Sequence, residues 1–417
     1  MNGGETLVAT LLEHGVDTGF CVPGESYLTV LEALRQAQAR IRLVLNRHES
    51  GATFAAEAYA KATAKPGIAF VTRGPGATNG SIGLHTAKQD STPLVLFIGH
   101  VPTTEMGREA FQEINYPTAF GPMTKGVIEV MRPEDVAAAT AEALRLSVAG
   151  RPGPVAVVLP EDVTESGANG AKIPTYKPRV VLAPKSQALD KAARMIDAAQ
   201  HPVIIGGEQV NFEGAHSALV RLAEAAGAGV ISAFRRQDIL AHKHTANLGH
   251  FGLRLAPYQE SFWTDVDLVM IAGARPDGAT LQGYSLLRAD QQVIHIYPES
   301  AAFAQTSPHV ALEADLAPSL EALAERLQNA PSNSRMAWRE ARHREHIAHA
   351  TPGLDATAQC LGAVDMAEII AHLSAAQINQ GLEKAIKKYI KPQFLVIDEL
   401  GFIPMDKLGC HLFFQII

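Results

Sequence analysis

Apolar runs alternate with helical patterns along the first part of the chain. Four runs rich in Val, Ile and Leu show no polar alternation, which is typical of parallel strands buried on both faces. They are Ile41–Asn46, Ile68–Thr72, Leu94–Ile98 and Val155–Leu159. Helical patterns occupy Glu5–His14, Ser26–Gln36, Ser50–Ala64 and Pro133–Val148. This alternation predicts an α/β domain with a parallel sheet covered on both faces, over residues 1–166.

The second half of the chain repeats this pattern. Residues 167–184 are rich in Gly, Ala, Pro and Lys without periodicity, which predicts a linker. Over 185–330, strands are expected at Val203–Ile205, Gly229–Ser232, Leu268–Ala272 and Val293–Tyr297, and helices at Ala215–Ala226 and Leu316–Leu327. Residues 330–360 are polar and rich in His and Arg, so we expect a solvated helix there; a basic ligand site is the alternative.

Composition excludes several classes of protein. The 417 residues are 47% hydrophobic and 19% charged, which is typical of a folded chain of two or three domains. A net charge of −7 gives no electrostatic reason to bind nucleic acid. The three cysteines match neither a disulfide framework nor a metal site. Without an apolar membrane span or a leader pattern, we expect a cytoplasmic protein with no nucleic-acid or membrane partner and no metal ligands.

Two strings following predicted strands carry candidate chemistry. Arg-His-Glu-Ser-Gly occupies residues 47–51, and Thr-Arg-Gly-Pro-Gly-Ala-Thr-Asn occupies residues 72–79. Open α/β sheets bind ligands where their strands end, so Glu49 is a candidate acid. The alternative is that Glu49 only interacts with the dipole of the helix it begins.

Four further short motifs strengthen the functional interpretation. They are Val-Pro-Gly-Glu at 22–25, Ala-Lys-Gln-Asp-Ser-Thr-Pro at 87–93, Phe-Gln-Glu at 111–113 and Gly-Arg-Pro-Gly-Pro-Val at 150–155. Together with residues 47–51 and 72–79, they resemble the pyrimidine-binding domain of thiamine-diphosphate-dependent enzymes, especially the acetolactate synthases. Residues 206–207, 273–275 and 295–298 resemble turns of that family's central domain. The resemblance implies two doubly wound parallel-sheet domains.

The resemblance also implies roles for particular residues. Glu49 matches the glutamate that hydrogen-bonds N1′ of the aminopyrimidine and promotes its imino form, for which the acid must be partly buried. The cofactor side is matched by Pro23, Gly24, Glu25, Thr72, Pro75, Gly76 and Asn79, and the substrate side by Phe111 and Gln112. His48 is either an acid–base group or a histidine packed at the strand end.

The other half of the family's cofactor site has no counterpart in this sequence. In the family, a third domain holds Mg²⁺ and the diphosphate through a Gly-Asp-Gly motif, which occurs nowhere in the 417 residues. We therefore expect a half-site for thiamine diphosphate, with no Mg²⁺ ligands and the diphosphate-binding domain missing. Acetolactate synthases also hold FAD in the central domain. Pro276-Asp277-Gly278 departs from the family pattern, which argues slightly against FAD.

The last residues resemble a different family. Residues 331–374 are interpreted as a linker and the start of the lost domain, and 375–417 resemble the ATPase helper protein of certain bacterial insertion sequences. The strand Phe394–Ile397 leads into Asp398 and Glu399, a Walker B pattern, although a chance apolar strand would look similar. No phosphate-binding Gly-x-x-x-x-Gly-Lys-Ser/Thr loop accompanies it. A mobile element that interrupted the gene would explain this junction, as would an artificial fusion.

Three functional hypotheses follow. The first is a truncated acetolactate-synthase-like enzyme, inactive alone, whose ancestor decarboxylated or joined 2-oxo acids and which forms a homodimer through its pyrimidine domain. The second is a non-catalytic module that binds thiamine diphosphate or a nucleotide and dimerises. The third is an ATPase, which rests only on the C-terminal segment.

Overall fold

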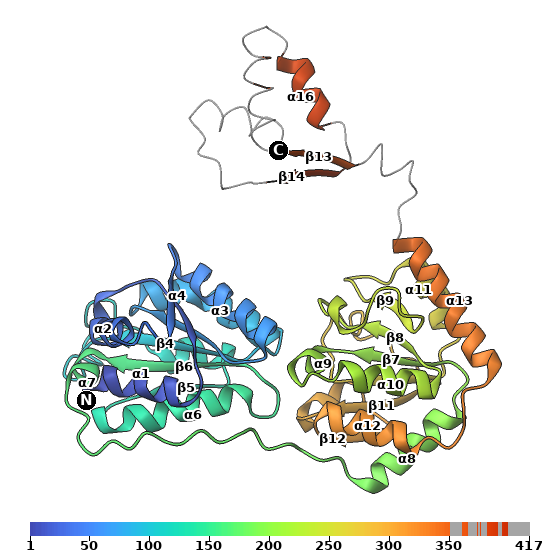
Figure 1. Cartoon of the computed structure of the whole chain (residues 1–417), viewed down its shortest axis with the longest axis horizontal. Coiled ribbons are helices and arrows are strands. Elements are labelled where there is room, and N and C mark those ends of the chain that lie inside the picture. Colours follow the sequence, from blue (N-terminus) through green and yellow to red (C-terminus); the bar gives the residue numbers. More distant parts are fainter. Residues whose placement is uncertain (351–360, 366–372, 374–375, 377–381, 391–393, 399–417) are drawn as a thin grey trace. The chain divides into compact units, whose positions relative to one another are not determined.

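The chain folds into two compact units, Met1–His343 and Arg344–Ile417, in the computed structural model (Figure 1). The structure describes residues 1–350, 361–365, 373, 376, 382–390 and 394–398. The first unit contains two α/β domains, each built on a six-stranded parallel sheet.

The N-terminal domain has the strand order β2-β1-β3-β4-β6-β5. Its strands are β1 (Thr18–Cys21), β2 (Arg42–Leu45), β3 (Gly67–Val71), β4 (Leu94–His100), β5 (Gly126–Glu129) and β6 (Pro154–Pro160). Its helices are α1 (Gly3–Glu13), α2 (Leu28–Gln36), α3 (Glu49–Thr63), α4 (Pro75–Gln89), α5 (Tyr116–Phe120), α6 (Val136–Val148) and α7 (Glu161–Glu165). The apolar side chains of α1, α2 and α6 pack on one face of the sheet, and those of α3 and α4 pack on the other.

Helices α3 and α4 approach each other closely because three glycines of α4 face α3. A Cβ at Gly76 would lie 3.3 Å from Oε1 of Glu49, and a Cβ at Gly80 would lie 3.3 Å from Cγ2 of Thr53. At Gly83, a Cβ would overlap the side chain of Thr53. The glycines therefore bring α4 against the helix that begins with Glu49.

The central domain has the strand order β12-β11-β10-β7-β8-β9. Its strands are β7 (Pro202–Gly206), β8 (Gly229–Ser232), β9 (Asn247–His250), β10 (Leu268–Ala272), β11 (Gln292–Tyr297) and β12 (Val310–Glu313). Its helices are α8 (Ser186–Ala198), α9 (Glu208–Phe212), α10 (His216–Ala226), α11 (Pro257–Trp263), α12 (Leu316–Arg326) and α13 (Asn333–Ala350). Helices α8, α10 and α12 cover one face of the sheet, and α11 with Trp338 of α13 covers the other.

The fold class predicted from the sequence is confirmed, and every predicted strand of the two sheets is present. The sequence did not predict β1, β5, β9 and β12, each only four residues long, nor helices α4, α5, α7, α8, α9 and α11. The expectation that β2 is buried is wrong, because β2 is an edge strand with Arg42 and Leu45 exposed.

The prediction of a solvated helix after residue 330 is also wrong for one side of α13. Arg335 and Arg339 are only 7% and 1% exposed. The guanidinium of Arg339 donates to the carbonyl of Ala223 and to Oγ1 of Thr245, at 3.4 and 3.2 Å. These acceptors bind the guanidinium inside the protein. A polar sequence was therefore not a reliable sign that this side of the helix is exposed to solvent.

Residues 168–185 contain no helix or strand, as the linker prediction requires. The linker is nevertheless attached to the central domain through Asp315, which is fully buried. Asp315 accepts hydrogen bonds from Nη1 of Arg179 at 2.7 Å and from the backbone N–H of Leu182 at 2.9 Å.

In the second unit, β13 (Leu361–Asp365) pairs in parallel with β14 (Phe394–Asp398), and α16 spans Leu382–Ile390. Strand β14 confirms the strand predicted before the acidic pair, whereas Glu399 lies outside the described residues. None of the described helices is long and apolar enough to cross a membrane.

A buried histidine in β11 predicts a pH-dependent stability. His295 is completely buried and its Nδ1 lies 2.9 Å from Oγ1 of Thr306. Burial disfavours the charged imidazolium and lowers the pKa of His295 from 6.5 to about 4. Below pH 6.5 the unfolded chain therefore binds more protons than the folded chain, and stability falls as the pH drops toward 4. We expect a loss of about 2 kcal/mol between pH 7 and pH 5 from this group.

Urea unfolding at the two pH values checks this expectation. The variant His295→Gln should lack this part of the pH dependence, so the drop in its unfolding free energy should be smaller than that of the wild type. An equal drop in both proteins would contradict the assignment to His295.

Candidate functional site

The candidate residues follow four neighbouring strands of the N-terminal sheet. The turn Pro23–Glu25 comes after β1, Glu49 after β2, Thr72–Asn79 after β3, and Phe111 with Gln112 after β4. These strands are adjacent and parallel, in the order β2-β1-β3-β4. All these groups therefore start from one edge of the sheet, the carboxyl edge, where the strands end and where open α/β sheets bind ligands.

Glu49 is the first residue of α3 and only 9% exposed. Nδ2 of Asn79, from α4, donates a hydrogen bond of 3.0 Å to Oε2 of Glu49. The absence of a side chain at Gly76 leaves Oε1 room beside the first turn of α4. The structure thus brings Gly76 and Asn79, both of α4, against the buried carboxyl group of Glu49 at the start of α3.

His48 lies directly before this helix and is exposed. Its Nδ1 accepts a hydrogen bond from the backbone N–H of Ser50 at 3.2 Å, so it caps α3. The interpretation of His48 as a histidine packed at the strand end is wrong. Its acid–base role stays a prediction.

The turn after β1 is attached to the loop after β3. Oγ of Ser26 and Oγ1 of Thr72 share a hydrogen bond of 2.8 Å. A Cβ at Gly24 would lie 2.5 Å from Cβ of Thr72, so only glycine permits this approach. Pro23 lies exposed in the first turn, and Pro75 is the exposed first residue of α4.

The loop carrying Phe111 and Gln112 packs on Gly74. The backbone of Gly74 has φ +45°, and a Cβ there would overlap the carbonyl oxygen of Gln112. The N–H of Gly74 donates to the hydroxyl of Tyr116 at 3.0 Å. Phe111 is 72% exposed beside this loop, a position open to solvent in a single chain.

Sequence reasoning gave no role to Arg73, which the structure places at the centre of the loops. Arg73 is 8% exposed, and its guanidinium pairs with Glu25 at 2.6 Å and with Glu161 of α7. Its guanidinium carbon lies 6.0 Å from the ring centroid of Phe111. Arg73 therefore links the segments after β1, β3, β4 and β6. The sequence signal that could have revealed these contacts is Glu161, an acidic residue directly after β6, at the same sheet edge as Glu25.

Within the described part of the chain, no group of three or more His, Cys, Asp or Glu side chains is placed to hold a metal ion. The candidate site consists of the buried carboxyl group of Glu49, the side-chain amide of Asn79 and the backbone of Gly76, which approaches that carboxyl group closely. Such a set suits a neutral heteroaromatic ring with hydrogen-bonding nitrogens.

Family models place both sheet domains in one class of protein. Residues 1–119 match "Thiamine pyrophosphate enzyme, N-terminal TPP binding domain", and residues 189–323 match "Thiamine pyrophosphate enzyme, central domain". Together with the two six-stranded parallel sheets, these matches show that this part of the chain belongs to the thiamine pyrophosphate enzymes.

Within that class, the chain is similar to acetolactate synthases. It is 32% identical over 304 residues to the "Probable acetolactate synthase large subunit" of Methanocaldococcus jannaschii, which covers 71% of this chain and 51% of the relative. It is 33% identical over 334 residues to the chloroplastic acetolactate synthase of Arabidopsis thaliana, with 78% of this chain and 49% of the relative covered. The chain thus spans about half the length of the curated relatives it matches.

A solved structure supports the fold. A putative thiamin diphosphate-dependent enzyme from Mycobacterium smegmatis superimposes with a TM-score of 0.70 at 24% identity, covering 80% of this chain and 64% of that chain.

The C-terminal segment resembles another family, as the sequence predicted. Residues 346–417 match the model "IstB-like ATP binding protein". This match begins before residue 375, where we placed the boundary, and the exact domain limits stay predictions.

Proposed function

We propose that residues 1–166 supply the aminopyrimidine side of a thiamine diphosphate site derived from an acetolactate-synthase-like enzyme. The observation that supports this is the buried carboxyl group of Glu49, held by Asn79 at the carboxyl edge of the sheet. Bound thiamine diphosphate supplies a nucleophilic carbon for the decarboxylation or joining of 2-oxo acids. In this proposal Glu49 holds a proton at N1′ of the pyrimidine, and Asn79 fixes the orientation of Glu49.

The close approach of backbone to Glu49 fits a flat ring. Gly76 and Gly24 leave no side chain between the two turns, and Thr72 is tied back to Ser26. Arg73 contacts Glu25, on the side proposed for the cofactor, and Phe111, on the side proposed for the substrate. The ring would therefore meet the acid and two turns whose positions are fixed by hydrogen bonds.

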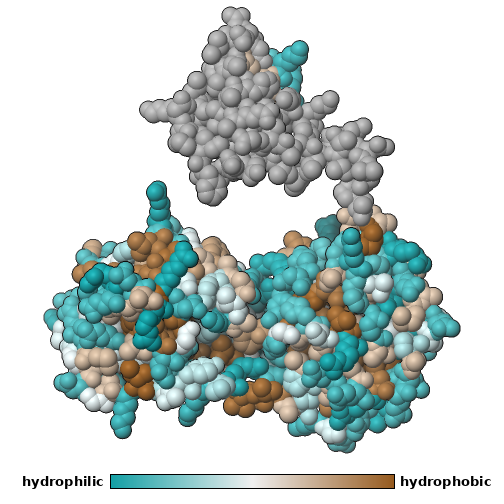
Figure 2. Space-filling view, viewed as in Figure 1, coloured by the Kyte–Doolittle hydropathy of each residue, from teal (hydrophilic) through white to brown (hydrophobic). Residues whose placement is uncertain are grey.

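The diphosphate and Mg²⁺ require groups beyond these. No Gly-Asp-Gly motif occurs in the 417 residues, so the proposal assigns the diphosphate and Mg²⁺ to residues of an intact partner chain. A second chain also fits the surface near Glu49, because Phe54 of α3 and Ile82 of α4 are 40% and 51% exposed. Apolar residues are visible on the surface of this domain in Figure 2. A dimer through the N-terminal domain would cover them.

Calorimetric titration with thiamine diphosphate and Mg²⁺ tests the proposal. A protein of these 417 residues should give no binding heat at tens of micromolar, and no turnover of pyruvate above a Glu49→Gln control. Light scattering should give twice the mass of the 44.5 kDa chain. Tight Mg²⁺-dependent binding would mean that residues of this chain complete the site, and the half-site proposal would be wrong.

The alternative is a non-catalytic module that binds thiamine diphosphate or a nucleotide and dimerises, and flavin absorbance of the purified protein would favour it. An ATPase role would depend on β14 alone, with no phosphate-binding loop in the sequence. The cytoplasmic location stays a prediction.

A further inference from the structure

The carboxyl edge of the central sheet is the place where a dinucleotide would bind in this fold. There, a glycine-rich turn after the first strand normally offers free backbone N–H groups to a diphosphate. In this chain the corresponding turn joins β7 to α9. Two of its N–H groups already have protein partners: Gly207 donates to the carbonyl of Ala272 at 3.1 Å, and Gln209 donates to that of Gly273 at 3.0 Å.

An acidic side chain occupies the first position of α9. Glu208 accepts a hydrogen bond from the hydroxyl of Tyr297 at 2.7 Å and another from the backbone N–H of Arg275 at 3.2 Å. Two donors from the ends of β11 and β10 are therefore bound to a protein carboxylate. A diphosphate at this edge would meet a negative charge and donors that are already used.

The glycines of both turns are explained by protein packing. A Cβ at Gly207 would overlap Ala274. Gly273 has φ +62°, and a Cβ there would lie 2.6 Å from the side chains of both Gln209 and Leu316. The two turns pack directly on each other, so their glycines do not indicate the approach of a ligand.

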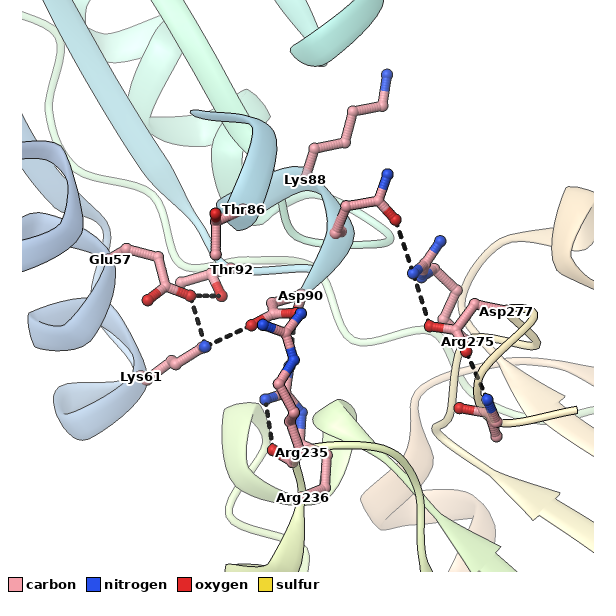
Figure 3. A network of polar contacts seen from close by, with 12 residues as sticks. Glu57, Lys61, Thr86, Lys88, Asp90, Thr92, Arg235, Arg236, Arg275 and Asp277 are labelled. Atoms are coloured by element: carbon pink, nitrogen blue, oxygen red, sulfur yellow. Dashed lines mark hydrogen bonds and ion pairs between the residues drawn. The ribbon is translucent and has the colours of Figure 1, made fainter. Parts of the chain in front are cut away.

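The arginines near this edge bind the N-terminal domain instead. Figure 3 shows Lys61 and Arg235 converging on Asp90, which follows α4 and is 6% exposed. Nζ of Lys61 lies 2.6 Å from Oδ2 of Asp90, Arg235 pairs with Oδ1, and Nη2 of Arg236 donates to the carbonyl of Asp90 at 2.6 Å. Nη2 of Arg275 donates to Oε1 of Gln89 at 2.9 Å.

The cavity described at this edge is small. A cavity of about 280 Å³ is lined by Lys61 and Asp90 of the N-terminal domain and by Glu208, Asn211, Phe212 and Arg235 of the central domain. Ligand pockets usually measure roughly 300–1,000 Å³ for drug-sized molecules, and a dinucleotide is larger than these.

We infer that the carboxyl edge of the central sheet is a joint that holds the N-terminal domain, with Asp90 at its centre, and that it does not accept FAD or another dinucleotide. This goes beyond the pyrimidine-site proposal and does not depend on it. The resemblance to acetolactate synthases would imply FAD here, and the residues present do not fit it.

Flavin binding tests the second part of the inference. The purified protein should carry no flavin absorbance, and added FAD at tens of micromolar should show no quenching of its fluorescence. ADP as a second probe should leave the melting temperature unchanged. Flavin retained at about one molecule per chain, or saturable quenching, would overturn the inference whatever the result with thiamine diphosphate.

Calorimetric unfolding of the full chain tests the joint. In Asp90→Asn, the N-terminal and central domains should unfold in separate transitions, the first lowered by at least about 5 °C. The matched control is Glu57→Gln. Glu57 is equally buried and pairs with Lys61 and Thr92, but it makes these contacts inside the N-terminal domain. This control should shift the transition without splitting it. A single unsplit transition in Asp90→Asn would overturn the inference.

Discussion

The substitution Arg335→Met is expected to lower the free energy of unfolding by about 3–4 kcal/mol, the largest effect we predict. Arg335 lies in α13, is 7% exposed, and reaches across two helix ends. Its Nη1 donates to the carbonyls of Ala226 at 2.8 Å and Ile196 at 3.3 Å, and its Nη2 donates to those of Asp197 at 3.1 Å and Ala199.

These four carbonyls belong to the last turns of α8 and α10, where backbone oxygens lack partners within the helix and the dipole favours a cation. Methionine would fill much of the volume but would leave the carbonyls buried without donors. Chemical denaturation measures the loss. Arg344→Met is the matched control, because Arg344 is on the same helix and exposed, and it should change stability by less than about 0.5 kcal/mol. Equal effects of the two substitutions would contradict the capping role.

The second large effect is expected from Gly83→Ala, which should destabilise the N-terminal domain by about 2–3 kcal/mol. The new methyl group would overlap the side chain of Thr53 and lie 3.0 Å from its carbonyl carbon. A change of rotamer at Thr53 cannot relieve the backbone contact, so α3 and α4 must move apart. Asn79 would then move away from Glu49, and the arrangement of the candidate site would change with the stability.

Gly51→Ala is the control for this substitution. Gly51 lies exposed in α3, and a Cβ there would meet only Oδ1 of Asn46, at 3.7 Å. Since alanine favours the helix, this variant should be more stable than the wild type by up to about 1 kcal/mol. Thermal unfolding of both variants gives the comparison. If Gly83→Ala proves as stable as Gly51→Ala, the helices have room to adjust and the expected destabilisation is wrong.

The candidate site illustrates how far sequence reasoning reached. The resemblance gave Gly76 and Asn79 roles beside the aminopyrimidine, and only the structure shows that both lie against Glu49. Arg73 was part of the same string but received no role, because its partners Glu25 and Glu161 come from other strands. The FAD question was also open in the sequence, since a glycine-rich turn has the same composition whether it faces a diphosphate or another turn.

The sequence by itself determined the two parallel sheets, the linker between them, the resemblance of both domains to thiamine pyrophosphate enzymes and the different family of the C-terminal segment. These follow from local patterns: apolar runs buried on both faces, glycine at tight approaches, and motifs in one order. Only the tertiary structure decided that Arg335 and Arg339 are buried, that β2 is exposed at an edge, and that Glu208 and Asp90 occupy the edge of the central sheet. The physical reason is that burial and pairing of a charged side chain depend on carbonyls and carboxylates brought near it by residues distant in the chain, which no local pattern records.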